Sequence, residues 1–355
     1  MSKLFEKLKI RDVAFRNRLW ISPMCQYSSV DGMPTDWHLV HLGSRAVGGA
    51  GLVIVEATAV VPEGRISPAD SGIWSEEHAQ AFARITAFIK QQGAVAAIQI
   101  AHAGRKASTA VPWLGSGAVL PTDGGWQVVG PSDKAFAPDF PEPQAMTHQQ
   151  IEQTVAAFQM AARRAVNAGF EVVEIHSAHG YLLHEFLSPL SNDRADEFGG
   201  DLENRMRFPL MVAEAVRKEV PETLPVFVRI SATDWVEGGW DVGQSVQYAL
   251  RLRELGIDLI DTSTGGNVPR AEIPVGPGYQ VRFAREIREK AGIKTGAVGL
   301  ITEPLQAEQI IAEGSADAVL IARESLRDPF FPFKAARELG GSVDVPKQYL
   351  RAIEI

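Results

Sequence analysis

The hydrophobic positions along the chain form short apolar runs that alternate with amphipathic segments. The runs have the length of buried strands, and the segments between them have the period of helices. The candidate strands are Leu19–Cys25, Leu52–Ala57, Val95–Ala101, Phe170–Ile175, Val226–Ser231, Leu259–Thr262, Lys294–Val298 and Ala318–Ala322. Gly169, Gly256 and Gly314 each stand between a helical segment and the next strand, where a glycine commonly ends a helix. This order predicts strands joined by helical crossovers.

Two helix starts are marked by their spacing. Thr147 with Gln150, and Asp241 with Gln244, are placed like the two members of a capping box or a close relative of it. Eight strands alternating with helices over 355 residues, with no linker between halves, favour a single-domain (β/α)8 TIM barrel over a doubly wound sheet.

One connection is too long for a plain loop. From about residue 104 to 146 the chain is rich in Pro, Gly, Trp and Ser and has no convincing helix. Loops of this length in a compact domain are usually functional or disordered, and Trp113, Trp126 and Phe136 favour a packed segment. Because this loop follows the third strand, at the active face of a barrel, we expect a capping lid.

Composition excludes several classes of function. With 45% hydrophobic and 22% charged residues and a net charge of −8, the chain predicts an ordinary globular protein without nucleic acid as a main partner. The polar start and the lack of a long apolar stretch predict neither a signal peptide nor a membrane segment. A single cysteine, Cys25, rules out an internal disulfide and a thiolate-rich metal site. We expect a cytoplasmic protein.

The most informative motif is His176–Tyr181, which reads H-S-A-H-G-Y and follows a strand. The imidazoles of His176 and His179 are suited to hold a carbonyl oxygen or an oxyanion, and the phenol of Tyr181 to deliver a proton. The two histidines could also bind a metal. They have no thiolate partner and no H-E-x-x-H helix, however, and zinc usually needs three protein ligands, so we expect no metal.

A nucleotide cofactor would have to be bound as TIM barrels bind one, because neither G-x-G-x-x-G after a strand nor a P-loop is present. Barrels hold phosphate at the loops after strands seven and eight. Those ends carry Gly296–Gly299 and Ile321–Arg323. Glycine lets backbone amides approach a phosphate, and Arg323 supplies bidentate charge, so these ends predict a phosphate site.

Three further polar side chains stand in apolar strands. Cys25 ends the first candidate strand, where a thiol is either a core filler or a ligand contact. Gln99 and Arg229 interrupt apolar barrel strands, and burial of such groups is costly without a partner. A planar, polar cofactor over the barrel would satisfy both, and an amide and a guanidinium suit the carbonyls and ring nitrogens of a flavin.

Together these motifs resemble the Old Yellow Enzyme family, and more closely its thermophilic-like, YqjM-type branch. The resemblance covers nearly the whole chain. It rests on Ser22–Cys25, Ala101–Lys106, His176–Pro189 and Arg327–Phe330, which are specific only in combination.

The resemblance implies an FMN-dependent ene-reductase that oxidises NADPH. Its FMN would be held by Ser22, Pro23, Met24, Cys25, Ala57, Gln99, Arg229, Gly299, Ala322 and Arg323. His176 and His179 would bind the oxygen of an activated alkene, and Tyr181 would protonate its Cα. Cys25 would tune the redox potential of the flavin. Tyr27 would help to close the substrate site.

The resemblance also implies a homodimer or homotetramer. Arg351 resembles the family arginine that reaches a neighbouring subunit's pocket, within a tail of about residues 342–355. Two departures stand out. Ala322 replaces a glycine that the family often has before the phosphate-binding arginine, and the last four residues, Ala352–Ile355, contain no aromatic side chain.

Three rival functions are open at this point. A flavin barrel for dienoyl thioesters or amines would be expected to carry a cysteine cluster and a further dinucleotide domain. A flavin-free isomerase or aldolase would leave Gln99, Arg229 and Cys25 without a shared purpose. A flavin sensor without turnover gives no reason for Tyr181 beside two histidines. The physiological substrate does not follow from the sequence.

Overall fold

A closed barrel of parallel strands forms the centre of the molecule in the computed structural model, which describes residues 2–115 and 117–352. The strands neighbour one another in the order β10-β11-β12-β3-β4-β5-β8-β9 and close on themselves. The barrel strands are β3 (Leu19–Ile21), β4 (Leu52–Ala59), β5 (Val95–Ala101), β8 (Val172–Ser177), β9 (Val226–Ser231), β10 (Leu259–Ser263), β11 (Lys294–Ala297) and β12 (Ala318–Ile321). The predicted (β/α)8 barrel is confirmed, and each of the eight candidate strands corresponds to one barrel strand.

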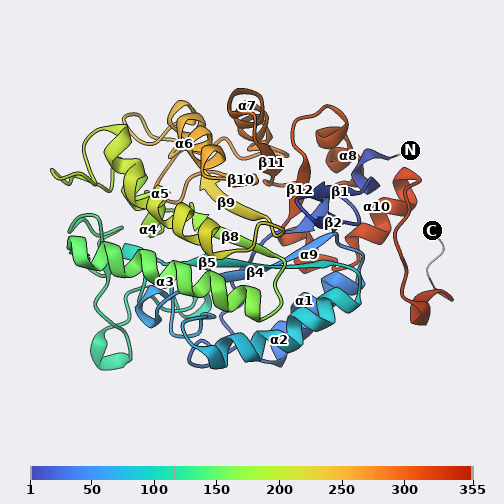
Figure 1. Cartoon of the computed structure of the whole chain (residues 1–355), viewed down its shortest axis with the longest axis horizontal. Coiled ribbons are helices and arrows are strands. Elements are labelled where there is room, and N and C mark those ends of the chain that lie inside the picture. The colour runs from blue at the N-terminus through green and yellow to red at the C-terminus, as the bar shows by residue number, and fades with distance from the viewer. Residues whose placement is uncertain (1, 116, 353–355) are drawn as a thin grey trace.

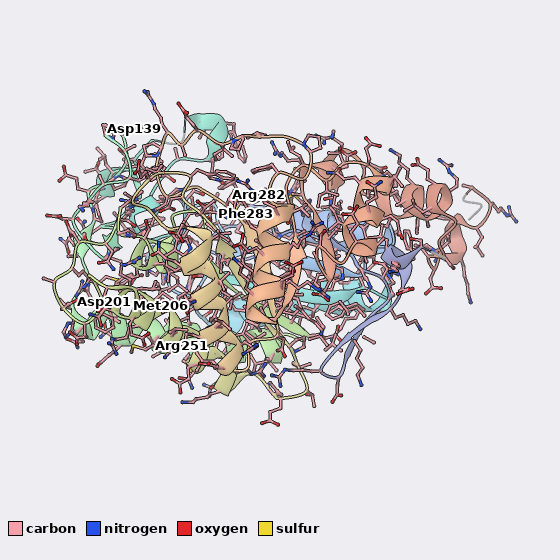
Figure 2. The ribbon with its side chains drawn as sticks, turned by 90° about the horizontal axis from the view of Figure 1, so that it is seen from above. Asp139, Asp201, Met206, Arg251, Arg282 and Phe283 are labelled. Carbon is pink, nitrogen blue, oxygen red and sulfur yellow. The ribbon has the colours of Figure 1, made fainter. Side chains whose placement is uncertain are left out.

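Helices surround the strands (Figure 1). They are α1 (Asp36–Val47), α2 (Glu76–Gln91), α3 (His148–Asn167), α4 (Leu182–Leu187), α5 (Leu202–Glu219), α6 (Val242–Glu254), α7 (Val281–Ala291), α8 (Pro304–Ala312), α9 (Arg323–Arg327) and α10 (Phe331–Leu339). Figure 2 shows α6 and α7 side by side, with Arg251 on the first and Arg282 and Phe283 on the second. In the described part of the chain, none of these helices is both long and apolar enough to cross a membrane.

The local signals in the sequence are borne out at most positions. Gly169, Gly256 and Gly314 have φ of +88°, +86° and +71° after α3, α6 and α8, a region that glycine adopts at little cost. Thr147 and Gln150 form the expected reciprocal capping box at the start of α3. At α6, Asp241 accepts a hydrogen bond from the Gln244 amide.

Several strand boundaries differ from the prediction by one residue or more, and two of the differences bear on the site. The first strand ends at Ile21 rather than Cys25, because Pro23 has no N–H to donate to a ladder. The strand expected at Phe170–Ile175 covers Val172–Ser177 instead. His176 therefore lies within β8 rather than after it, and its side chain belongs to the barrel wall.

A hairpin that the sequence analysis did not identify covers the N-terminal end of the barrel. Strands β1 (Leu8–Ile10) and β2 (Val13–Phe15) pair antiparallel, and their apolar side chains join the core inside the barrel. Phe15 packs on Trp20 with ring centres 4.7 Å apart, and Trp20 stacks on Phe227 at 5.7 Å. This plug leaves the opposite, C-terminal end of the strands for a site.

The long loop after β5 contains 3₁₀ turns and the two short strands β6 (Val129–Gly130) and β7 (Gln144–Ala145), and no α-helix in its described residues. The three aromatic residues named in the sequence analysis all make contacts. Trp113 packs edge-on against Tyr27, Trp126 donates a hydrogen bond to the Glu63 carbonyl, and Phe136 lies 4.6 Å from the Lys106 ammonium. The loop is thus packed against the segments that follow β3 and β4, and against its own first residues.

Candidate active site

Three aromatic side chains converge at the C-terminal end of β8. The ring of His176 lies 5.2 Å from that of His179 and 5.0 Å from that of Tyr181, edge to face in both cases. The turn between them is tight: His179 and Gly180 both have positive φ, 61° and 70°. Tyr181 is then the residue that immediately precedes α4. The sequence motif therefore forms one cluster at the barrel mouth.

Hydrogen bonds hold this turn in place from several sides. The His179 amide donates to Ser231 Oγ, and the His179 ring faces Ser263 Oγ at 2.7 Å. The Gly180 amide donates to the ring of His184. Lys106 Nζ, from the loop after β5, donates to the His179 carbonyl at 2.8 Å. The turn and the His179 ring are thus fixed by the folded protein itself.

Burial keeps the cluster uncharged. Desolvation, with a further contribution from Arg229, holds the pKa of both His176 and His179 well below the ordinary value. Burial also raises the pKa of Tyr181 well above its ordinary value. The histidines are therefore neutral at pH 7, and the phenol keeps its proton. His176 Nδ1 is buried and has no hydrogen-bond partner among the described residues, so it is free to bind a ligand.

Gln99 and Arg229 lie next to this cluster, but they do not lack protein partners as the sequence suggested. Gln99 Nε2 donates to Glu174 Oε1 at 2.8 Å, and Arg229 Nε lies 3.2 Å from Asp261 Oδ2. The burial of these two side chains is thus compensated within the protein, and their contact with a cofactor stays a prediction. The same reasoning, applied to the acidic residues Glu174 and Asp261 in their own barrel strands, would have found both.

The loop after β3 brings further predicted residues to the same place. Ser22 accepts a hydrogen bond from Arg229 Nη2 at 3.4 Å, and Pro23 and Met24 continue the chain to Cys25. Burial, with smaller contributions from Asp70 and Glu56, raises the pKa of the Cys25 thiol, so the thiol is protonated at pH 7.

Tyr27 and Ala57 complete this side of the barrel mouth. Tyr27 has φ of 50°, an uncommon conformation for a non-glycine residue, and its pKa is raised chiefly by burial and next by Cys25. Ala57 pairs with Gln99 across a β-bulge between β4 and β5. It shares a small cavity with Tyr181.

The predicted phosphate-binding residues line one cavity of ≈150 Å³ between the ends of β11 and β12. Gly299 has φ of +126°, and a Cβ there would lie 2.9 Å from Gln280 Nε2, so glycine keeps the cavity open. Ala322 has φ of −104° and ψ of −102°, a combination that lies between the common helical and extended regions. Arg323 lines the cavity, as does Arg327, a second cation that sequence reasoning did not assign. These residues suit a phosphate group.

Arg351 belongs to the C-terminal tail and to none of the barrel strands or helices. It is exposed, in a tail that extends beyond α10 on the outside of the molecule (Figure 1). Tyr349, two residues earlier, packs against Phe330 with ring centres 6.0 Å apart. Residues 353–355 of the noted C-terminal departure lie outside the described residues.

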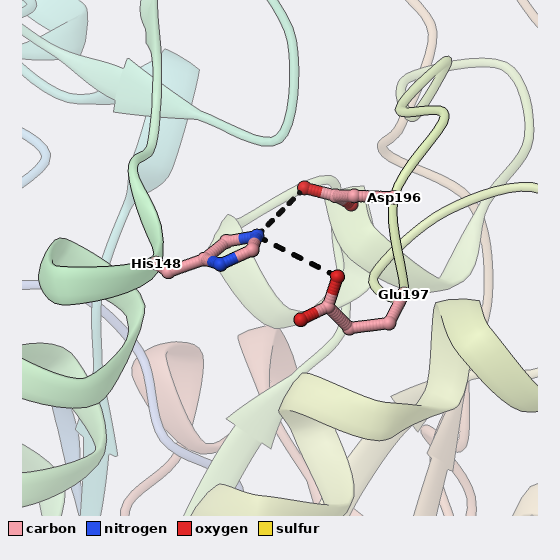
Figure 3. Close-up of side chains that lie close together, drawn as sticks. All are labelled: His148, Asp196 and Glu197. Atoms are coloured by element: carbon pink, nitrogen blue, oxygen red, sulfur yellow. Dashed lines mark hydrogen bonds and ion pairs between the residues drawn. The ribbon is translucent and has the colours of Figure 1, made fainter.

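A different trio has the composition of a metal site. His148, Asp196 and Glu197 bring three ligand atoms within 4.8 Å of one another at the start of α3 (Figure 3). Arg194 already forms two hydrogen bonds to Asp196, at 2.5 and 3.0 Å, and holds the pKa of that carboxyl below its usual range. We interpret the trio as a hydrogen-bonded cluster that ties α3 to the segment before α5.

Comparisons with known proteins agree with this architecture. Residues 3–341 match the NADH:flavin oxidoreductase / NADH oxidase family. An NADPH dehydrogenase of Geobacillus sp. (strain WCH70) is 50% identical over 350 residues, 98% of each chain. Among solved structures, morphinone reductase superposes with a TM-score of 0.79 and 26% identity over 98% of this chain and 92% of its own. A 2-naphthoyl-CoA reductase gives 0.85 and 27% over 95% of this chain, which spans only 52% of that longer protein.

Proposed function

Since the chain belongs to the NADH:flavin oxidoreductase / NADH oxidase family and is a flavin-dependent oxidoreductase, we propose that it is an ene-reductase. Its substrates would be NADPH and an activated alkene, such as an α,β-unsaturated carbonyl compound, a maleimide or a nitro compound. The observation that carries this proposal is the convergence of two neutral imidazoles and a protonated phenol beside Arg229 and Gln99.

The side chains at the barrel mouth fit FMN. The cavity at Gly299 and Arg323 would take the phosphate. The loop Ser22–Cys25 after β3 would line the isoalloxazine, together with Ala57 and Gln99 on the next two strands, β4 and β5. Arg229, whose guanidinium is pinned to Asp261, would face the polar edge of the ring. FMN bound there supplies a two-electron acceptor that takes hydride from NADPH and returns it to the alkene.

His176 and His179 would bind the substrate oxygen. As neutral imidazoles, each offers one N–H, and neutral donors in a water-poor site stabilise the negative charge that develops on that oxygen as hydride reaches Cβ. Ser263, 2.7 Å from the His179 ring, would fix the orientation of that ring. A substrate without such an oxygen would lose this stabilisation.

Tyr181 would deliver a proton to Cα on the face opposite to the hydride. Its raised pKa keeps the phenol protonated until an enolate-like carbon, which is basic enough, accepts the proton. Lys106 Nζ lies 5.0 Å from the centre of the Tyr181 ring, so a cation stands close to the phenolate that this transfer leaves behind.

The rim of the site would contribute in four further ways. We propose that Cys25 tunes the flavin, that Tyr27 closes the substrate site, and that the packed 104–146 loop acts as its lid. We also propose that the exposed Arg351 reaches the pocket of a second copy in a homodimer or homotetramer. Removal of the tail from residue 342 would then change both the oligomeric state and the affinity for substrate.

Separate measurement of the two half-reactions tests the proposal. Tyr181→Phe should slow oxidation of the reduced enzyme by cyclohexenone by roughly 10²–10⁴-fold, the usual contribution of a general acid, and leave reduction by NADPH unchanged. The control is Tyr248→Phe, which removes a buried phenol whose partner is Ser177 on β8, on the helix side of the barrel wall. Equal slowing of both half-reactions in the Tyr181→Phe protein would refute the proton-donor role.

The visible spectrum tests the activity as a whole. Flavin absorbance should bleach with anaerobic NADPH and return on addition of cyclohexenone. Bleaching without recovery would remove the alkene as substrate, and replacement of both His176 and His179 should abolish the charge-transfer band with a phenol.

A further inference from the structure

Two carboxyl side chains are completely buried inside the barrel, beneath the residues proposed to hold the flavin. Glu174 on β8 and Asp261 on β10 are both 0% exposed. Glu174 pairs with Gln99 of β5, and Asp261 pairs with Arg229 of β9, in the strand registers. Below them the barrel is filled by apolar side chains such as Trp20 and Phe227.

The contacts of the two carboxyl groups are not equivalent. Glu174 Oε1 accepts a hydrogen bond from Gln99 Nε2 at 2.8 Å, whereas Asp261 Oδ2 faces Arg229 Nε at 3.2 Å. The two carboxyl groups lie close enough for each to act on the pKa of the other, both through its charge and as a hydrogen-bond partner. Among the described residues, Glu174 Oε2 and both Asp261 oxygens are buried without a conventional donor, apart from the Arg229 ion pair.

A count of charges requires a proton between them. Among the described residues, Arg229 is the one cation acting on the pair, and the nearby imidazole of His176 is neutral. Two ionised carboxylates in contact, deprived of water, would carry a large desolvation cost that one cation offsets for only one of them. Burial raises the pKa of both groups. Asp261 raises that of Glu174 further, while Arg229 works against the shift at Asp261.

We propose that Glu174 and Asp261 share one proton, carried on Glu174 Oε2 and donated to the Asp261 carboxylate, and that the pair thereby sets the charge that Arg229 presents to the flavin. The Oε2 hydroxyl of Glu174 then donates to Asp261, while Oε1 accepts the hydrogen bond from Gln99. Asp261 stays ionised and neutralises Arg229. This inference rests on the proposed placement of the flavin over Arg229.

The arrangement limits how strongly the protein favours the reduced cofactor. Hydride brings two electrons and one proton, so reduction by NADPH adds one negative charge to the flavin. A bare Arg229 cation beside the ring would stabilise that charge, whereas the Asp261 carboxylate 3.2 Å behind it reduces the effect. Asp261 and Glu174 would thus be positioning residues that act on the cofactor through Arg229.

Two isosteric substitutions separate the roles. In the holoenzyme, Asp261→Asn removes the counter-charge of Arg229 and should shift the oxidised-to-reduced equilibrium toward the reduced flavin by at least tenfold, about 30 mV for a two-electron couple. Glu174→Gln keeps a neutral group that donates to Asp261, so its midpoint potential should stay within that margin of the wild type. A larger shift in Glu174→Gln than in Asp261→Asn would overturn the assignment of the proton.

A measurement on the protein without turnover gives independent evidence. Infrared difference spectra between the wild type and Glu174→Gln should contain the carbonyl stretch of one buried, protonated carboxylic acid, and the subtraction removes the band of Glu185, whose pKa burial raises to about 8. Persistence of the full band in that variant would also overturn the proposal, even if Asp261→Asn folds too poorly to be titrated.

The variant Arg229→Gln distinguishes a failure of the shared-proton proposal from a failure of the proposed function. If that variant leaves both the midpoint potential and the affinity for FMN unchanged, the flavin does not lie over Arg229, and the inference falls with its premise. If Arg229→Gln changes them while Asp261→Asn does not, the placement stands and the shared proton alone is wrong.

Discussion

Gly180, between the two catalytic candidates His179 and Tyr181, is the position where the smallest change should have the largest effect on the site. Its φ is +70°, and its backbone faces the segment after β10. A Cβ on residue 180 would lie 2.7 Å from Asn267 Cα and closer still to the Gly266 carbonyl oxygen. Both neighbours are backbone atoms, so neither can move aside as a flexible side chain would.

The cost of Gly180→Ala has two parts that a matched variant separates. Gly200 has φ of +81°, and a Cβ on that residue would meet nothing within 4 Å, so Gly200→Ala carries only the left-handed backbone penalty, about 1–2 kcal/mol. Gly180→Ala carries the same penalty and adds overpacking, typically about 1–3 kcal/mol. We expect Gly180→Ala to be the more destabilising by that second amount.

Thermal unfolding under identical conditions measures the difference. For a chain of this size ~1 kcal/mol moves the midpoint by roughly 1–2 °C, so the two variants should differ by a few degrees. Gly180→Ala should also slow alkene reduction, because the turn that aligns His179 and Tyr181 must shift, while Gly200→Ala should not. Equal midpoints and equal rates in the two variants would refute the argument from close approach.

Three further predictions follow from particular contacts. Burial lowers the pKa of His102 to about 4, so the folded state resists protonation of this imidazole. As pH falls from about 6.5 to 4, the free energy of unfolding of the wild type should therefore fall relative to that of His102→Asn, by up to about 1.4 kcal/mol per pH unit. Urea unfolding that gives the same difference between the two proteins at pH 7 and at pH 5 would contradict this. Thr147→Ala should cost about 1 kcal/mol by removing the α3 cap without changing activity, whereas Thr147→Ser should retain stability in the same thermal assay. Arg323→Ala should weaken FMN binding by about 1.5–3 kcal/mol, the contribution of a charge-assisted hydrogen bond, as measured by quenching of FMN fluorescence, with the exposed Arg285→Ala as the unaffected control.

Much of the fold could be predicted because its signals are local. Apolar runs identified each barrel strand, since parallel strands covered by helices are buried on both faces. Glycine and capping residues marked helix ends through their own backbone requirements, as at Gly169 and Thr147. The β1–β2 hairpin was missed because its runs are three residues long and its turn uses Arg11 and Asp12 rather than the usual Asn-Gly.

The site was harder to complete than the fold, because polar residues inside the barrel act in groups. Gln99 and Arg229 were noticed as isolated anomalies, and a ligand was invoked to satisfy them. Their actual partners, Glu174 and Asp261, come from two other strands. Spacing along the chain does not reveal which inward positions of neighbouring strands share a level, since that depends on the register of the closed barrel.

The backbone conformation of the loops at the barrel mouth is the least predictable feature, and the reason is physical. Positive φ occurs at seven non-glycine residues of the described chain. Five of them lie in segments that follow barrel strands: Tyr27, Ser108, His179, Trp235 and Leu300. Asp31 lies farther along the segment after β3, and Arg11 lies in the turn between β1 and β2. Tyrosine, tryptophan and leucine disfavour this region, so their identities argue against the conformation they adopt. A rigid barrel can impose such strain at its mouth because the cost is small beside the cohesion of the strands beneath. The strained residues include His179, proposed to bind the substrate oxygen, and Tyr27, proposed to close the substrate site. These are the positions where backbone precision matters most. His179→Gly, which relieves that strain and also removes the imidazole, should therefore leave the fold intact while it abolishes the binding of the substrate oxygen on which the proposed chemistry depends.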